Sequence, residues 1–124
     1  MSQTAHDLGR DAESIACDHL EQKGFEVVAK NWRSNRGELD IICRDGDALV
    51  FVEVKARSNN RFGGAPWALP PSKRDLVIRT ARHYLAERRL YGRVACRFDV
   101  VLVDAGVIPY GVTHITDAFQ AESL

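Results

Sequence analysis

The segment ALVFVEVKA, residues 48–56, most strongly constrains how this chain folds. Its β-branched and aromatic residues predict a strand with the apolar density of a central, covered position in a sheet. The Asp45-Gly46 pair just before it favours a tight hairpin turn after an earlier strand over residues 38–43. Two charged residues, Glu53 and Lys55, are embedded in this apolar strand, and their presence there needs an explanation.

Helical patterns lie on both sides of the hairpin. Residues 4–23 repeat apolar side chains at spacings of three and four, and Gly24 follows where a helix commonly ends. Glu13 lies at the edge of that apolar stripe. A second helix is expected to begin with Ser72 as its cap, and Asp75 three residues later completes a short capping box.

The remaining elements indicate the fold class. Further strands are expected at residues 25–32, 98–103 and 112–115, which gives the order αβββαββ. A helical connection between the third and fourth strands predicts an α/β fold with a mixed central sheet and flanking helices. A chain of 124 residues has the usual size of one domain, so a single domain over residues 1–124 is expected.

Strand alternation divides the hairpin into two faces. Leu39, Ile41 and Cys43 are expected to share an apolar face with Val50 and Val52. This pairing requires an even number of residues in the turn, because a slip by one residue moves a strand's side chains to the other face.

The same register brings a second set of side chains together. Asp40 falls opposite or diagonal to Glu53, with Lys55 two residues further along the same side. A solvent-exposed charge ladder is the structural alternative, since E-x-K is a common tripeptide. The apolar flanks argue against it, because burying an unpaired charge costs several kcal/mol.

Two carboxylates at this position suit a hard divalent cation. Mg²⁺ takes one or two carboxylates together with waters and phosphate oxygens. We expect Asp40 and Glu53 to bind Mg²⁺ or Mn²⁺, with the backbone carbonyl of Val54 as a further ligand. Lys55 would orient or deprotonate the attacking water, which is the chemistry of phosphodiester hydrolysis.

Five motifs in order carry a family resemblance: LGRDAESIACDHLEQKGF, NWRSNRGELDII, FVEVKAR, SKRDL and CRFDVV. Together they resemble the bacterial YraN-like family of uncharacterised proteins, placed in the PD-(D/E)XK nuclease superfamily. The resemblance implies a restriction-endonuclease-like fold with a Holliday-junction-resolvase-like core. It also implies catalytic roles for Glu13, Asp40, Glu53 and Lys55, although GELD stands where the superfamily has its "PD" element.

The charge distribution fits a nucleic-acid partner. The chain has 17 basic and 17 acidic residues, yet residues 62–97 hold 8 basic and 2 acidic ones. Phosphate contacts come mainly from such side chains. The residues expected to contact nucleic acid are Arg33, Arg36, Arg57, Arg61, Lys73 and Arg74.

Two functions follow as hypotheses. The leading one is a metal-dependent endonuclease that hydrolyses structured or branched DNA, acting as a homodimer so that two sites meet two strands. The alternative is a non-catalytic nucleic-acid-binding module on a nuclease fold, acting in DNA repair or processing. Metal titration separates them, because affinity in a pure binder should not depend on Asp40 and Glu53.

The cysteine count and the first residues bear on the cellular compartment. Three cysteines, Cys17, Cys43 and Cys96, lie within apolar patterns and have no C-x-x-C spacing, which is typical of reduced, buried thiols. The polar, acidic start of the chain does not resemble a signal peptide. We therefore expect a cytoplasmic protein.

Overall fold

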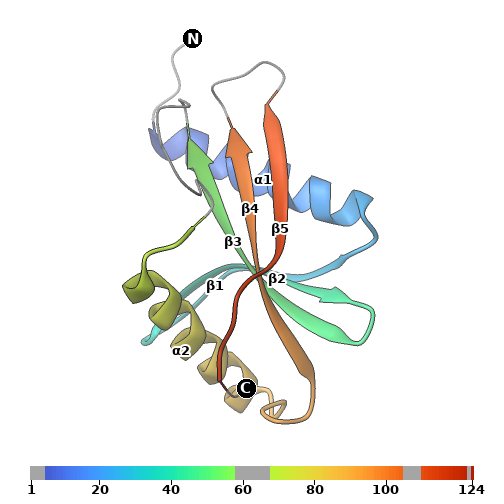
Figure 1. Cartoon of the computed structure of the whole chain (residues 1–124), viewed down its shortest axis with the longest axis vertical. Helices are drawn as coiled ribbons and strands as arrows, with labels where there is room; N and C mark the ends of the chain where they lie inside the picture. Colours follow the sequence, from blue (N-terminus) through green and yellow to red (C-terminus); the bar gives the residue numbers. More distant parts are fainter. Residues whose placement is uncertain (1–4, 58–67, 105–109, 123) are drawn as a thin grey trace.

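The computed structural model describes residues 5–57, 68–104, 110–122 and 124, with side chains described from Ala12 onward. Its elements follow the predicted order αβββαββ (Figure 1). They are α1 (Ala5–Gln22), β1 (Glu26–Ser34), β2 (Gly37–Asp45), β3 (Ala48–Arg57), α2 (Pro71–Glu87), β4 (Ala95–Asp104) and β5 (Gly111–Phe119). The strands begin or end up to four residues beyond the predicted bounds.

The five strands form one sheet in the order β1-β2-β3-β4-β5. β3 and β4 are parallel and are connected through α2, whereas the other neighbouring pairs are antiparallel. The predicted mixed sheet is therefore confirmed. The predicted even turn is confirmed as well, because Asp45 pairs with Ala48 and leaves a two-residue connection.

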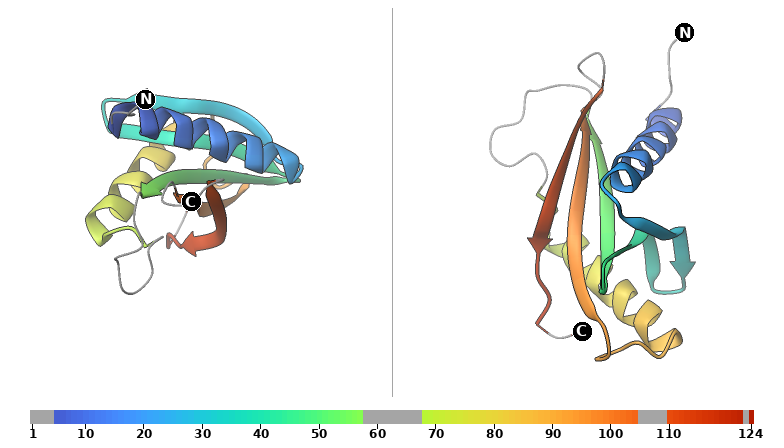
Figure 2. Two further views of the ribbon diagram at one scale, coloured as in Figure 1. Left: turned by 90° about the horizontal axis from the view of Figure 1, so that it is seen from above. Right: turned by 90° about the vertical axis from the view of Figure 1, so that its right-hand side faces the viewer.

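The two helices cover opposite faces of β3 (Figure 2). Val50 and Val52 face α1 together with Ala16 and Leu20, whereas Phe51 faces α2. Each of these side chains is fully buried. This alternation explains the apolar density of the strand, since both of its faces pack against a helix.

The predicted face of Leu39 is wrong. Leu39 packs in the cluster under α2, whereas Ile41 packs in the cluster under α1. The β2–β3 pairing begins at Ile41 and Val52, and Leu39 pairs with Trp32 of β1 instead. On either side of Asp40, where β2 stops pairing with β3, the side chains at odd-numbered positions of β2 therefore pack against different helices. Simple alternation along a strand does not predict this change.

The predicted cap of the second helix is also wrong. α2 begins at Pro71, Pro70 occupies the cap position, and no side chain caps the helix. A proline at the first helical position has a backbone torsion already suited to a helix, so the cap lies at Pro70, two residues before the predicted Ser72. Ser72 therefore lies inside the helix, and its first turn contains no acidic residue.

The three cysteines are free thiols, as predicted. Cys17 and Cys43 are buried and Cys96 is half-buried. Burial is the main cause that raises the pKa of each thiol above its ordinary value, which disfavours the reactive thiolate. Within the part of the chain that the structure describes, no helix is long and apolar enough to cross a membrane.

Candidate metal centre

Asp40 and Glu53 meet where β2 leaves β3. The backbone N–H of Asp40 donates to Glu53 Oε2 at 3.2 Å, and the backbone N–H of Val54 donates to Asp40 Oδ2 at 2.9 Å. Side chains thus take over the hydrogen bonds that the two strands would otherwise exchange. Each carboxylate is held by the strand that carries the other, which fixes the separation of the pair.

Both carboxyl groups are difficult to ionise in this position. Burial first, and then the charge of Asp40, raise the pKa of Glu53 from 4.5 to about 7. Burial also raises the pKa of Asp40, opposed by the hydrogen bond from Val54. Glu53 is 2% exposed, and its Oε1 atom is buried without a hydrogen-bond partner. The pair therefore has more negative charge than its hydrogen bonds compensate.

The two neighbouring lysines make different contacts. Lys73 in the first turn of α2 forms an ion pair with Glu53, with 3.5 Å between Nζ and Oε1. Lys55 instead donates from Nζ to the backbone carbonyl of Ala68 at 2.8 Å. The predicted catalytic lysine thus holds the segment that leads into α2, while a lysine predicted to bind nucleic acid lies against the carboxylate.

Two more acidic residues influence Asp40. Glu13 of α1 is half-buried, and its charge raises the pKa of Asp40, as does that of Glu38. The charge of Glu38 is partly compensated by Arg33, with 3.3 Å between Arg33 Nε and Glu38 Oε2. Glu13 on α1 thus lies near enough to Asp40 for its charge to act on that carboxyl group, and the catalytic roles of Glu13, Asp40 and Glu53 stay a prediction.

The donor set fits Mg²⁺. Among the described residues, no group of three or more His, Cys, Asp or Glu side chains is arranged to hold a metal ion. Mg²⁺ does not require such a group, because it commonly keeps several waters and binds through one or two carboxylates and substrate phosphates. Glu53 Oε1, which has no hydrogen bond and only the 3.5 Å ion pair with Lys73, is the kind of atom such an ion would engage. Val54 contributes its N–H to Asp40, and a role for its carbonyl stays a prediction.

The residues predicted to contact nucleic acid have different surroundings. Arg36 is exposed beyond β1, and Arg74 is half-buried in the first turn of α2. Arg57 is bound to Asp104, with 3.3 Å between Nη2 and Oδ2, and its side chain is 20% exposed. Arg61 lies outside the described residues. Arg36 is therefore better placed than Arg57 to reach a phosphate.

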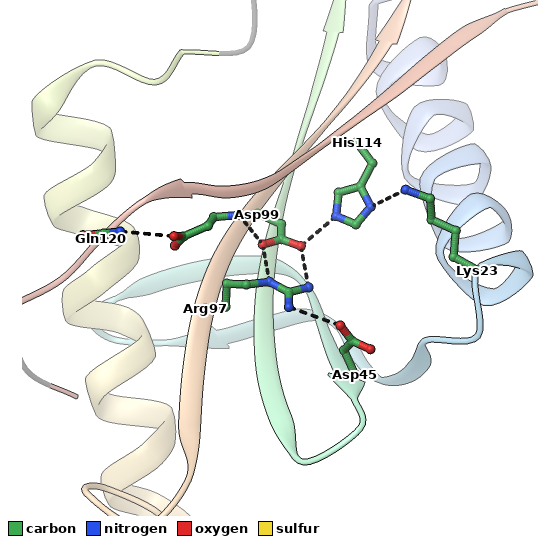
Figure 3. A network of polar contacts seen from close by, with 7 residues as sticks. Lys23, Asp45, Arg97, Asp99, His114 and Gln120 are labelled. Atoms are coloured by element: carbon green, nitrogen blue, oxygen red, sulfur yellow. Dashed lines mark hydrogen bonds and ion pairs between the residues drawn. The ribbon is translucent and has the colours of Figure 1, made fainter.

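Sequence reasoning missed a second charged cluster, on the α1 face of β4. Asp99 is fully buried and accepts hydrogen bonds from Arg97 Nε at 2.9 Å and from His114 Nε2 at 2.7 Å (Figure 3). Arg97 also bonds Asp45, and His114 contacts Lys23 Nζ through Nδ1 at 3.1 Å. The sequence signal was a single aspartate within the apolar strand at 98–103. This cluster connects β2, β4 and β5 with Lys23, the residue that follows α1.

The sequence pattern of a family described as Uncharacterised protein family UPF0102 matches residues 12–103, about three quarters of the chain. The chain belongs to this family. The UPF0102 match runs from Ala12 in α1 to Val103 in β4. It therefore contains Glu13, Asp40, Glu53 and Lys73.

Relatives that align over most of the chain carry the same family name. A UPF0102 protein of Pseudomonas aeruginosa strain LESB58 is 40% identical over 121 residues, covering 96% of this chain and 97% of the relative. A UPF0102 protein of Dechloromonas aromatica is 44% identical over 114 residues, covering 92% and 89%. One of Nitrosomonas europaea is 46% identical over 100 residues, covering 81% and 83%. These three alignments thus cover most of this chain and most of each relative.

Proposed function

We propose that this UPF0102 protein is a metal-dependent endonuclease of the PD-(D/E)XK superfamily that hydrolyses phosphodiester bonds in structured or branched DNA. One observation carries the proposal: Glu53 is buried beside Asp40, and its Oε1 has no hydrogen bond. Such a pair is unfavourable in a purely structural role, because the 3.5 Å ion pair between Oε1 and the half-exposed Lys73 compensates the two buried carboxylates only in part. A divalent cation would supply the missing compensation.

The chain's own residues have separable roles in this proposal. Asp40 and Glu53 would hold Mg²⁺ or Mn²⁺, and the N–H groups of Val54 and Asp40 orient the two carboxylates. When bound, the ion would supply Lewis-acid chemistry and a more acidic bound water. Glu13 would attract the cation from the side of α1, and Lys55 positions the entry to α2 through Ala68.

The substrate would approach over the α2 side of the site. Lys73 and Arg74 lie in the first turn of α2, where the helix dipole also favours phosphate. Arg33 and Arg36 lie at the β1–β2 turn and would contact the backbone further along. A homodimer would bring two such sites to the two strands of a branched substrate.

One observation favours the alternative, a nucleic-acid-binding module without catalysis. The ammonium of Lys55 is engaged by the carbonyl of Ala68 at 2.8 Å, whereas the nuclease pattern requires this lysine at the reacting phosphate. If that contact persists with substrate bound, the protein would bind DNA without cleaving it.

A cleavage screen separates the two functions. Purified protein is incubated with labelled four-way junction, flap and single-stranded DNA in Mg²⁺, Mn²⁺ or EDTA. The endonuclease proposal expects metal-dependent products that disappear with Asp40→Asn and with Glu53→Gln. If no substrate is cleaved in either metal, while all three proteins bind DNA equally, the binding module is the correct function.

A further inference from the structure

We infer that Lys73 is the built-in counter-cation of the carboxylate pair, and that the divalent metal displaces it from Glu53 so that its ammonium becomes available to a phosphate of the nucleic acid. This inference rests on the proposed function and adds a residue that the resemblance does not assign to the metal site. Lys73 would thus take part in both steps: the metal displaces it from Glu53, and the nucleic acid then binds it through a phosphate.

The geometry of the ion pair supports the exchange. Lys73 Nζ lies 3.5 Å from Glu53 Oε1, whereas a charge-assisted hydrogen bond measures about 2.7–2.9 Å. The Glu53 side chain is 3% exposed and fixed by the N–H of Asp40, but the Lys73 side chain is 45% exposed. One partner is therefore immobile, and the other can leave on a flexible stem of four carbons.

Lys73 also acts on both carboxylates. The ammonium lies 3.5 Å from Glu53 Oε1, and Glu53 Oε2 accepts a hydrogen bond from the N–H of Asp40 at 3.2 Å. The positive charge of Lys73 therefore lies beside the carboxylate pair that a metal would require. A bound dication would occupy the same negative site, and the ammonium would then be repelled rather than attracted.

The position of Lys73 in its helix is a second, independent observation. Positive side chains are unfavourable in the first turn of a helix, where acidic residues are preferred. α2 has Lys73 and Arg74 there and no acidic residue. This departure from the local preference is compensated in the metal-free protein by Glu53, and a phosphate at the same place would compensate it in the complex.

The first test measures Mg²⁺ binding by isothermal titration calorimetry, without DNA. Lys73→Met is compared with Arg79→Met, which removes the same charge from an exposed position on the same helix. Lys73→Met should bind Mg²⁺ about five- to tenfold more tightly than wild type, because the competing cation is gone. Arg79→Met and Lys73→Arg should stay within about twofold of wild type.

The outcomes separate the inference from the proposed function. If wild type binds Mg²⁺ and Lys73→Met binds it no more tightly, the counter-cation role is refuted and the metal site stands. If wild type and both methionine variants bind no Mg²⁺ at millimolar concentration, the proposed function fails and the inference fails with it.

A second test follows the released ammonium. Fluorescence anisotropy of a labelled four-way junction is measured in Ca²⁺, as a non-cleaving substitute for Mg²⁺, and in EDTA. Lys73→Met should weaken binding several-fold more in Ca²⁺ than in EDTA, since only the metal-loaded protein frees Lys73 for phosphate. An equal loss in both conditions would overturn the exchange, because Lys73 would then contact DNA regardless of metal.

Discussion

Glu53→Gln should stabilise the metal-free protein near pH 8. Burial, followed by the charge of Asp40, raises the pKa of Glu53 from 4.5 to about 7, which corresponds to roughly 3 kcal/mol of unfavourable free energy when the group is ionised. Glutamine keeps the shape of the side chain and removes the charge. Because the variant loses the ion pair with Lys73 and must satisfy a buried NH₂ group, we expect a net gain of about 1–2 kcal/mol.

The pH dependence has a definite sign. The folded-state pKa of Glu53 lies above its unfolded value, so the folded protein binds this proton more tightly. The wild-type free energy of unfolding should therefore fall as the pH rises from about 4.5 to about 7 and then level off. The advantage of Glu53→Gln should be full near pH 8 and disappear toward pH 4.5.

Urea denaturation in EDTA, followed by circular dichroism at both pH values, measures this difference. Glu26→Gln is the matched control, because Glu26 is exposed on β1 and its removal should change stability by less than about 0.5 kcal/mol. Adding Mg²⁺ should then stabilise wild type and leave Glu53→Gln unchanged. A Glu53→Gln protein less stable than wild type near pH 8 without metal would refute the reasoning, since the carboxylate would then be fully compensated.

Three further predictions concern other parts of the molecule. Asp99→Asn should lower the free energy of unfolding by about 3 kcal/mol in urea denaturation, because the half-buried guanidinium of Arg97 and the buried imidazole of His114 lose their carboxylate partner. Gly37→Ala should lower the melting temperature, measured by calorimetry, because the added Cβ would lie 2.6 Å from Thr80 Oγ1 at a backbone φ of +152°. Arg36→Gln should weaken DNA binding, measured by fluorescence anisotropy, and reduce the slope of log affinity against log salt concentration by about one. Arg57→Gln should mainly lower the free energy of unfolding, measured by urea denaturation, because Arg57 is paired with Asp104.

The sequence alone was sufficient to predict features that follow from the regular alternation of side chains along a strand or from the residues of a turn. The order of elements, the two-residue hairpin connection and the proximity of Asp40 to Glu53 all follow from alternation and turn chemistry. Leu39 was misplaced because β2 changes its facing at Asp40, where side-chain bonds replace ladder bonds. Alternation cannot indicate where a strand leaves its neighbour.

The lysines show a different limit. Both Lys55 and Lys73 were identified as functional candidates, but their contacts depend on how the start of α2 docks against β3. The sequence predicted the cap at Ser72, two residues after its observed position at Pro70. Successive side chains of a helix differ in direction by about 100°, so the residue that meets β3 depends on how the helix docks, which the pattern of the helix alone does not give.

The sheet contains a second buried acid, Asp99, with which the pKa of Glu53 can be compared. Glu53 pairs with Val100 on the neighbouring strand, and Val52 pairs with Asp99, so two buried acids lie one register step apart on opposite faces. Burial alone would raise the pKa of Asp99, but hydrogen bonds from His114, Arg97 and Asp117 outweigh it and lower that pKa. A single NMR titration of carboxyl carbons would therefore observe both outcomes in one molecule: a buried acid whose partners outweigh the effect of burial, and a buried acid whose partners do not.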